Sequence, residues 1–107
     1  MTARLALGDA EDARAALEAR WLHLTRVALP EAAIPRGWPV HLDHCFQRIL
    51  LDAACGGQWY EHVAGRPAYR RCAPDLLARA VALAEAALEG RADLHALNRA
   101  SLAWRGR

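Results

Sequence analysis

Three polar residues, His44, Arg48 and Asp52, recur every fourth position in a segment whose other residues favour a helix. Side chains at this spacing lie along one face of an α-helix, so each can contact the next. Imidazole exchanges protons near neutral pH, and a guanidinium group binds carboxylate or phosphate. The spacing therefore predicts His44 and Asp52 as catalytic residues, with Asp52 orienting or charging the imidazole. Arg48 is predicted either to bind the substrate anion or to pair with Asp52.

A loop rich in aromatic and arginine residues follows this helix. We expect its binding residues to be Trp59, Arg66, Tyr69 and Arg70. Aromatic faces next to arginines can stack on a planar anion and hold it. The sequence therefore predicts a polar pocket beside the 42–55 helix that binds a small anionic or aromatic ligand, with metal-free acid/base catalysis as an extension.

Other interpretations of the same residues stay open, including whether the protein is an enzyme at all. The helix could carry an ordinary solvated ion pair, and the aromatic residues could simply fill the core. A non-enzymatic interaction module would instead present its loop to a protein or to single-stranded nucleic acid, using Arg66, Arg70 and Arg71. Arg105 and Arg107 would extend that surface or form a solvated tail.

The effect of removing charge from Arg48 or Asp52 separates these interpretations. A solvated pair predicts a loss of stability below about 1 kcal/mol, and a buried structural bridge predicts about 3–5 kcal/mol. A functional site predicts little change in stability and a loss of binding or turnover. The sequence favours the functional site.

Histidine and cysteine spacing does not favour a metal site, so we expect no metal and no cofactor. His41, His44, Cys45, Cys55 and His62 lack Cys-x2-Cys or His-Glu-x2-His spacing. His44 and Cys45 point about 100° apart on a helix, which also disfavours a nucleophilic Cys-His pair. No glycine-rich phosphate loop, dinucleotide-binding fingerprint or Gly-x-Ser-x-Gly motif is present.

The elements that must position these residues are helices. Apolar residues recur every three or four positions, and no alternating strand pattern appears. We expect helices at 9–29, 42–55, 74–89 and 93–104, with a loop at 30–39 that Ile34 and Trp38 fix to the core. Pro30 should end the first helix, and Gly56-Gly57 the second. The chain, residues 1–107, is therefore predicted to be a single compact all-α domain of about four helices.

Composition limits the class of protein and its partners. The 107 residues carry a formal charge of +2 from intermixed acids and bases, which does not favour a nucleic-acid partner. The start does not resemble a signal peptide, and no run approaches the ~18 apolar residues of a membrane span. Cys45, Cys55 and Cys72 lack paired spacing, which is typical of reduced thiols. We therefore expect a cytoplasmic protein without a membrane partner.

Several short runs resemble a set of small uncharacterised bacterial proteins, over about Leu17 to the end of the chain. They are Asp43–Asp52, Gly57, Trp59, the Arg-Pro-Ala-Tyr-Arg of 66–70, Leu97-Asn98 and Leu102–Arg105. Some of that set carry the label GCN5-related N-acetyltransferase, which implies acetyl-CoA-dependent acyl transfer on a mixed sheet with an Arg/Gln-x-x-Gly-x-Gly/Ala loop. This chain has neither a strand pattern nor that loop, so the resemblance assigns no site residues.

Overall fold

The structure, a computed structural model, describes the chain from Thr2 to Arg107 and its side chains from Asp9 onward. The helical elements are α1 (Thr2–His23), the π-helical η1 (Leu24–Ala28), α2 (Leu29–Ala33), α3 (Asp43–Cys55), the 3-10 turn η2 (Trp59–Glu61), α4 (Ala68–Arg71), α5 (Pro74–Leu88) and α6 (Leu94–Trp104). The described residues contain no strand, and the prediction of a compact all-α fold is confirmed. None of the described helices is long and apolar enough to cross a membrane.

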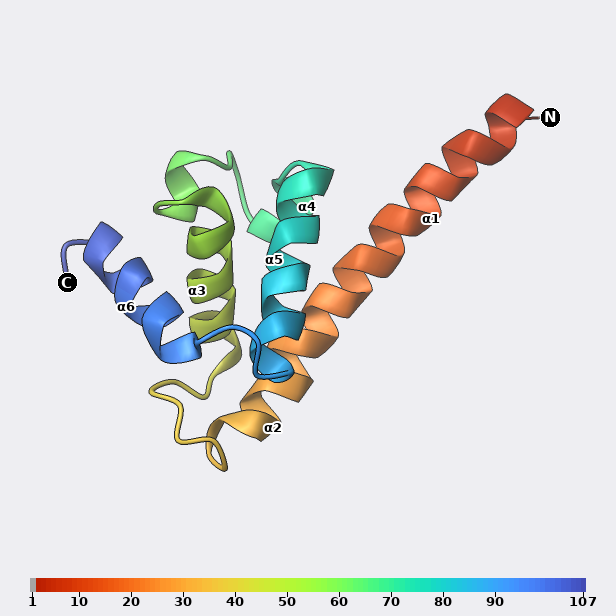
Figure 1. Cartoon of the computed structure of the whole chain (residues 1–107). Helices are drawn as coiled ribbons and strands as arrows, with labels where there is room; N and C mark the ends of the chain where they lie inside the picture. The colour runs from red at the N-terminus through yellow and green to blue at the C-terminus, as the bar shows by residue number, and fades with distance from the viewer. Residues whose placement is uncertain (1) are drawn as a thin grey trace.

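Helix α3 lies at the centre of the fold, with α5 on one side and α6 on the other (Figure 1). Helix α1 packs against α5, and its N-terminal part extends away from the body of the protein, which gives a longest dimension of 51 Å. Trp21 of α1, Phe46 and Leu50 of α3, and Leu77 of α5 are fully buried between these helices. This arrangement leaves one side of α3 facing α1 and the 59–69 segment.

The predicted ends of three helices are confirmed. Helix α3 ends at Gly56, whose φ of 72° is the left-handed conformation that glycine adopts without strain. Helix α5 has Pro74 in its first turn, where the missing N–H has no helical partner to lose. The Asp93 carboxylate caps α6 by accepting a hydrogen bond from the Ala96 N–H at 3.2 Å. Local sequence therefore sets the ends of the helices that surround the site.

Both predicted ends of the first helix were wrong. Its helical backbone begins at Thr2 rather than Asp9, and it continues past Pro30 to Ala33. Proline inside a helix lacks an N–H and clashes with the carbonyl four residues earlier. The π-helical segment immediately before α2 widens the helix and accommodates the ring, so the chain does not need to leave the helix.

Only one of the two residues predicted to fix the loop after α2 to the core does so. Trp38 packs edge-to-face on Phe46, with ring centroids 5.9 Å apart, and fixes the loop to the core as expected. Ile34, however, is 79% exposed, so its predicted anchoring role was wrong. The extra turn of α2 places Ile34 at the end of the helix, where its side chain faces solvent.

Candidate ligand-binding site

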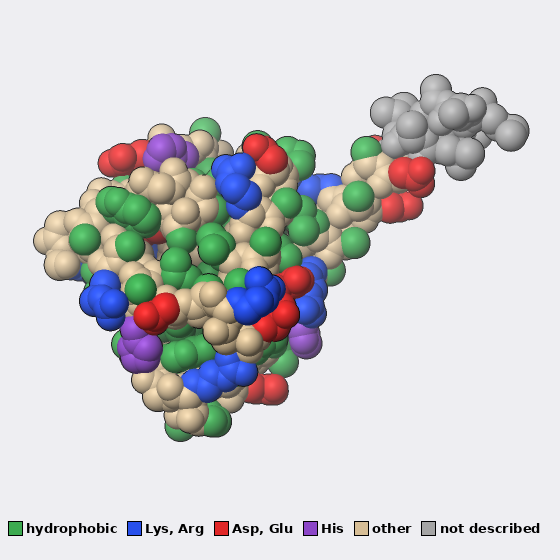
Figure 2. Space-filling model, in the orientation of Figure 1, with side chains coloured by type: hydrophobic (Ala, Val, Ile, Leu, Met, Phe, Trp, Pro, Cys, Tyr) green, Lys and Arg blue, Asp and Glu red, His purple; other side chains and the backbone are tan. Residues whose placement is uncertain are grey.

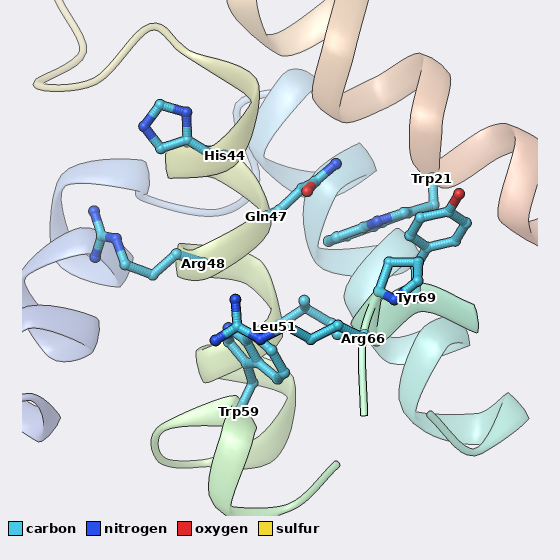
Figure 3. A pocket seen from close by; sticks show the side chains of 10 residues that line it. Trp21, His44, Gln47, Arg48, Leu51, Trp59, Arg66 and Tyr69 are labelled. Carbon is cyan, nitrogen blue, oxygen red and sulfur yellow. The ribbon is translucent and has the colours of Figure 1, made fainter. Parts of the chain in front are cut away.

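A pocket of about 470 Å³ lies beside α3, between that helix, α1 and the 59–69 segment (Figure 3). Its lining combines three aromatic rings, two guanidinium groups, an imidazole and an amide. The lining residues are Trp21, His44, Gln47, Arg48, Leu51, Trp59, Arg66, Pro67, Ala68 and Tyr69. Pockets of this size and mixed chemistry commonly accommodate small organic molecules.

Most of the predicted site residues meet in this pocket. His44, Arg48, Trp59, Arg66 and Tyr69 all line it. Two others do not, since Asp52 is fully buried and Arg70 lines a separate groove of about 460 Å³ between α1 and Pro74. Tyr69 and Arg70 are neighbours in α4, but the Tyr69 side chain lines the pocket and the Arg70 side chain lines the groove.

The buried carboxylate of Asp52 is the centre of a polar network that joins α3 to α6. Arg105 binds it in a bidentate manner, with Nε 2.8 Å from Oδ2 and Nη2 3.0 Å from Oδ1. Ser101 Oγ donates to Oδ2 at 2.7 Å, and the Trp59 N–H donates to Oδ1 at 2.9 Å. Asp52 is therefore a positioning residue, which holds α6 and the backbone of Trp59 in place.

The predicted pairing of Arg48 with Asp52 was wrong. Arg48 Nη1 donates to Ser101 Oγ at 2.7 Å, and Nη2 donates to Asn98 Oδ1 at 2.9 Å. Packing of α6 against α3 brings Ser101 between the two charges, and Arg105 takes the carboxylate instead. Burial lowers the pKa of Arg48 below its ordinary value, but an arginine remains charged at neutral pH.

Arg105 does not belong to a solvated tail. The hydrogen bond to Asp52 raises the pKa of Arg105 above its ordinary value. Its guanidinium also lies 5.2 Å from the centre of the Tyr60 ring. Arg105 therefore belongs to the network that closes the end of α6, and it is not available as part of an exposed arginine surface.

His44 lies on the solvent side of the pocket, away from Asp52. Its side chain is 73% exposed, and Nδ1 is 3.6 Å from Oδ1 of Asp43. Two helical turns, about 12 Å along the axis, separate His44 from Asp52. Every contact of the Asp52 carboxylate described above is made to α6 or to Trp59. The neighbour that can orient the imidazole is therefore Asp43.

Two fixed aromatic residues and one exposed arginine form the mouth of the pocket. Trp59 is held through its backbone by Asp52, and Arg14 Nη2 donates to the backbone carbonyl of Tyr69 at 2.8 Å. The guanidinium of Arg66 lies 5.4 Å from the centre of the Trp59 ring. Within the described part of the chain, Arg66 makes no hydrogen bond or ion pair, so its donors face solvent at the pocket mouth.

Sequence reasoning missed five pocket residues, which are Trp21, Gln47 and Leu51 on helices, and Pro67 and Ala68 between Arg66 and Tyr69. Trp21 and Leu51 are buried apolar residues on helices, and periodicity alone cannot distinguish a pocket wall from a core position. Gln47 lies at the border of the apolar stripe, which is the one signal that could have identified it. Its Nε2 donates to Thr25 Oγ1 at 3.1 Å, which fixes the amide against α1 and η1.

The three cysteines are free thiols, in agreement with their spacing. Burial raises the pKa of both Cys55 and Cys72 above the ordinary value of 9.0. Within the described residues, no group of three or more histidine, cysteine or acidic side chains lies close enough to hold a metal ion. Cys55 and Cys72 are thus neutral thiols packed in or against the core near neutral pH.

These raised pKa values predict how stability changes at alkaline pH. A thiol that ionises less readily in the folded state stabilises the fold below its ordinary pKa, and that contribution is lost as pH rises through the folded value. Urea denaturation at about pH 8 and about pH 10 should therefore show a smaller alkaline loss for a Cys55→Ala, Cys72→Ala variant than for the original chain. Equal losses would contradict this prediction.

Neither the surface charge nor comparison with known proteins identifies a ligand for this pocket. Basic and acidic side chains are interspersed on the face shown in Figure 2, which gives no extended surface of one sign. Comparison of the chain with protein-family models, curated proteins and solved structures finds no match. The resemblance to the bacterial set therefore stays a prediction.

Proposed function

We propose that this protein binds a small aromatic carboxylate in the pocket beside α3. The observation that carries the proposal is one guanidinium group without a hydrogen bond among the described residues, lying in the same hollow as three aromatic residues. The guanidinium is that of Arg66, and the aromatic residues are Trp21, Trp59 and Tyr69. A ligand with one flat apolar face and one anionic end could contact the aromatic residues with its face and the guanidinium with its anionic end.

The two ends of the pocket differ in chemistry. The guanidinium of Arg66 lies over Trp59 on one side of the pocket, and Trp21 and Tyr69 lie on the other side, while the side chains of Arg48 and His44 point away from them (Figure 3). Arginine forms short, charge-assisted hydrogen bonds with carboxylates. Aromatic side chains supply large apolar contact area with few rotatable bonds. The ligand carboxylate therefore belongs near Arg66, with its ring on the side of Trp21 and Tyr69.

Naphthoate is a suitable first probe, because its fused rings and single carboxylate match the two ends. About 13 non-hydrogen atoms at about 0.3 kcal/mol each give a Kd of about 1 mM. In a titration followed by proton–nitrogen correlation spectra, we expect saturable shifts at the backbone amides of α3, Trp59 and Tyr69. Added salt should weaken binding, because the carboxylate is held by a partly solvated cation.

The matched control ligand is naphthalene methanol, which keeps the rings and removes the charge. It should bind about tenfold more weakly if Arg66 contacts the carboxylate. Shifts scattered over the whole surface, or no saturation with naphthoate, would contradict the proposed function.

Acid/base catalysis would use His44 on its own, because Asp52 is occupied by Arg105 and Ser101. The observation that favours it is the solvent access of an imidazole that also lines the pocket. In that version His44 exchanges a proton with the bound ligand, and Asp43 orients it. A His44→Gln variant would then keep its affinity for ligand and lose turnover.

The rival function is an interaction module that needs no pocket. Exposed apolar side chains support it, chiefly Ile34 at 79% and Leu42 at 48% exposure. Ile34 and Leu42 belong to the connection between α2 and α3, whereas Tyr60, also 48% exposed, belongs to the 59–69 segment. A protein partner that binds at Ile34 and Leu42 would contact a different part of the molecule, and naphthoate would not compete with it.

A further inference from the structure

The indole N–H of Trp21 is a buried donor without an acceptor. Trp21 is fully buried. Among the side chains that the structure describes, its Nε1 is a buried polar atom that makes no hydrogen bond. A buried donor without a partner costs about 1–3 kcal/mol of folding free energy, and buried indoles usually find an acceptor. Since Trp21 also lines the pocket, the missing acceptor points to a ligand.

Two neighbouring polar groups, the Thr25 hydroxyl and the amide nitrogen of Gln47, are already committed to other contacts. Thr25 Oγ1 donates to the backbone carbonyl of Trp21 at 2.9 Å and accepts from Gln47 Nε2 at 3.1 Å. These two bonds turn the amide nitrogen of Gln47, a donor, toward α1 and η1. An amide nitrogen cannot accept from an indole N–H, and no hydrogen bond joins the amide oxygen of Gln47 to Nε1.

We propose that the ligand is a heteroaromatic monocarboxylate whose ring bears a hydrogen-bond acceptor for Trp21 Nε1–H. This inference rests on the proposed function, and it specifies the chemical group that the ligand carries opposite its carboxylate. The carboxylate lies at Arg66, and a ring nitrogen or carbonyl oxygen lies at the opposite end. Specificity follows because a ligand without the acceptor leaves the indole unpaired.

Access to Nε1 requires a small shift of the pocket wall. Tyr69 lies beside the Trp21 indole in Figure 3, and both line the same hollow. Tyr69 is only half-buried and belongs to the four-residue α4, whose contact with α1 is made through Arg14 and the Tyr69 backbone. The proposal therefore requires the Tyr69 ring to turn aside while its backbone stays fixed, so that the indole edge is open to the ligand.

The test compares naphthoate with the quinoline carboxylates, which replace one ring C–H by an acceptor nitrogen and keep the shape. At least one isomer, with nitrogen in the ring distant from the carboxylate, should bind about fivefold more tightly than naphthoate. In the original chain, the indole proton of one tryptophan should move downfield with that isomer and not with naphthoate. A Trp21→Phe variant should lack that signal and lose the preference between the ligands.

The outcomes separate this inference from the proposed function. If naphthoate and all quinoline carboxylates bind equally well, and the indole signal does not respond, the Trp21 assignment is overturned and the pocket proposal stands. If neither class binds, both are overturned. The spectra of the original chain keep the test decisive if Trp21→Phe fails to fold, because the other three indole signals can be assigned through Trp38→Phe, Trp59→Phe and Trp104→Phe.

Discussion

Asp52→Asn is expected to lower the free energy of unfolding by about 3–5 kcal/mol, measured by urea denaturation. The substitution keeps the volume of the side chain and an acceptor for the Trp59 N–H. It removes the charge that Arg105 pairs with, at a position where Asp52 is fully buried and Arg105 is 18% exposed. The guanidinium is then left with an uncompensated charge, and the joint between α3 and α6 weakens.

A matched control is Asp75→Asn, which removes the same charge from an exposed pair with Arg79. That pair should contribute less than about 1 kcal/mol, because solvent screens it. Adding Arg105→Met to Asp52→Asn should recover part of the lost stability, since it removes the unpaired charge. A loss below about 1 kcal/mol for Asp52→Asn would contradict the structural role of this carboxylate.

This expectation reverses the one that the sequence favours for Asp52. Spacing on one helix places Asp52 on a line with His44 and Arg48, and in the structure Arg48 and His44 do reach the pocket. Arg105 is 53 positions further along the chain. Only the packing of α6 against α3 brings it to Asp52, and helical periodicity carries no information about the order of packing.

Local signals predicted the helices better than they predicted the connections. Gly56, Pro74 and Asp93 set the ends of their helices through their own backbone or capping chemistry, so the sequence was sufficient. Pro30 carries an equally strong local signal, yet the helix continues through it. The burial of Leu29 and Ala33 against the core is a tertiary contact that outweighs the local preference.

Only one of the two aromatic walls of the pocket could be predicted from the sequence. Trp59, Arg66 and Tyr69 cluster within the most irregular stretch of the chain, and that clustering indicated a binding loop. Trp21 forms the opposite wall from a different helix. Its position in an apolar stripe is the same as that of a core residue, so its unpaired donor appears only in three dimensions.

Arg66→Gln is expected to weaken the binding of naphthoate about tenfold, a loss of about 1.4 kcal/mol. Arg66 lines the pocket and lies over Trp59, and the described residues give it no hydrogen-bonded role in the fold. Loss of one charged hydrogen bond to a carboxylate is sufficient for a change of this size. Because the side chain is exposed at the pocket mouth, stability should stay within about 0.5 kcal/mol of the original.

The most direct test of the pocket is titration calorimetry of naphthoate with Arg66→Gln and Arg70→Gln side by side. Both variants remove one positive charge from the same short segment, and sequence reasoning assigned both arginines to binding. Arg70 instead lines the groove between α1 and Pro74. We predict that Arg70→Gln binds within about twofold of the original chain, while Arg66→Gln binds about tenfold more weakly. Equal weakening in both variants, or none in Arg66→Gln, would contradict a ligand site in this pocket.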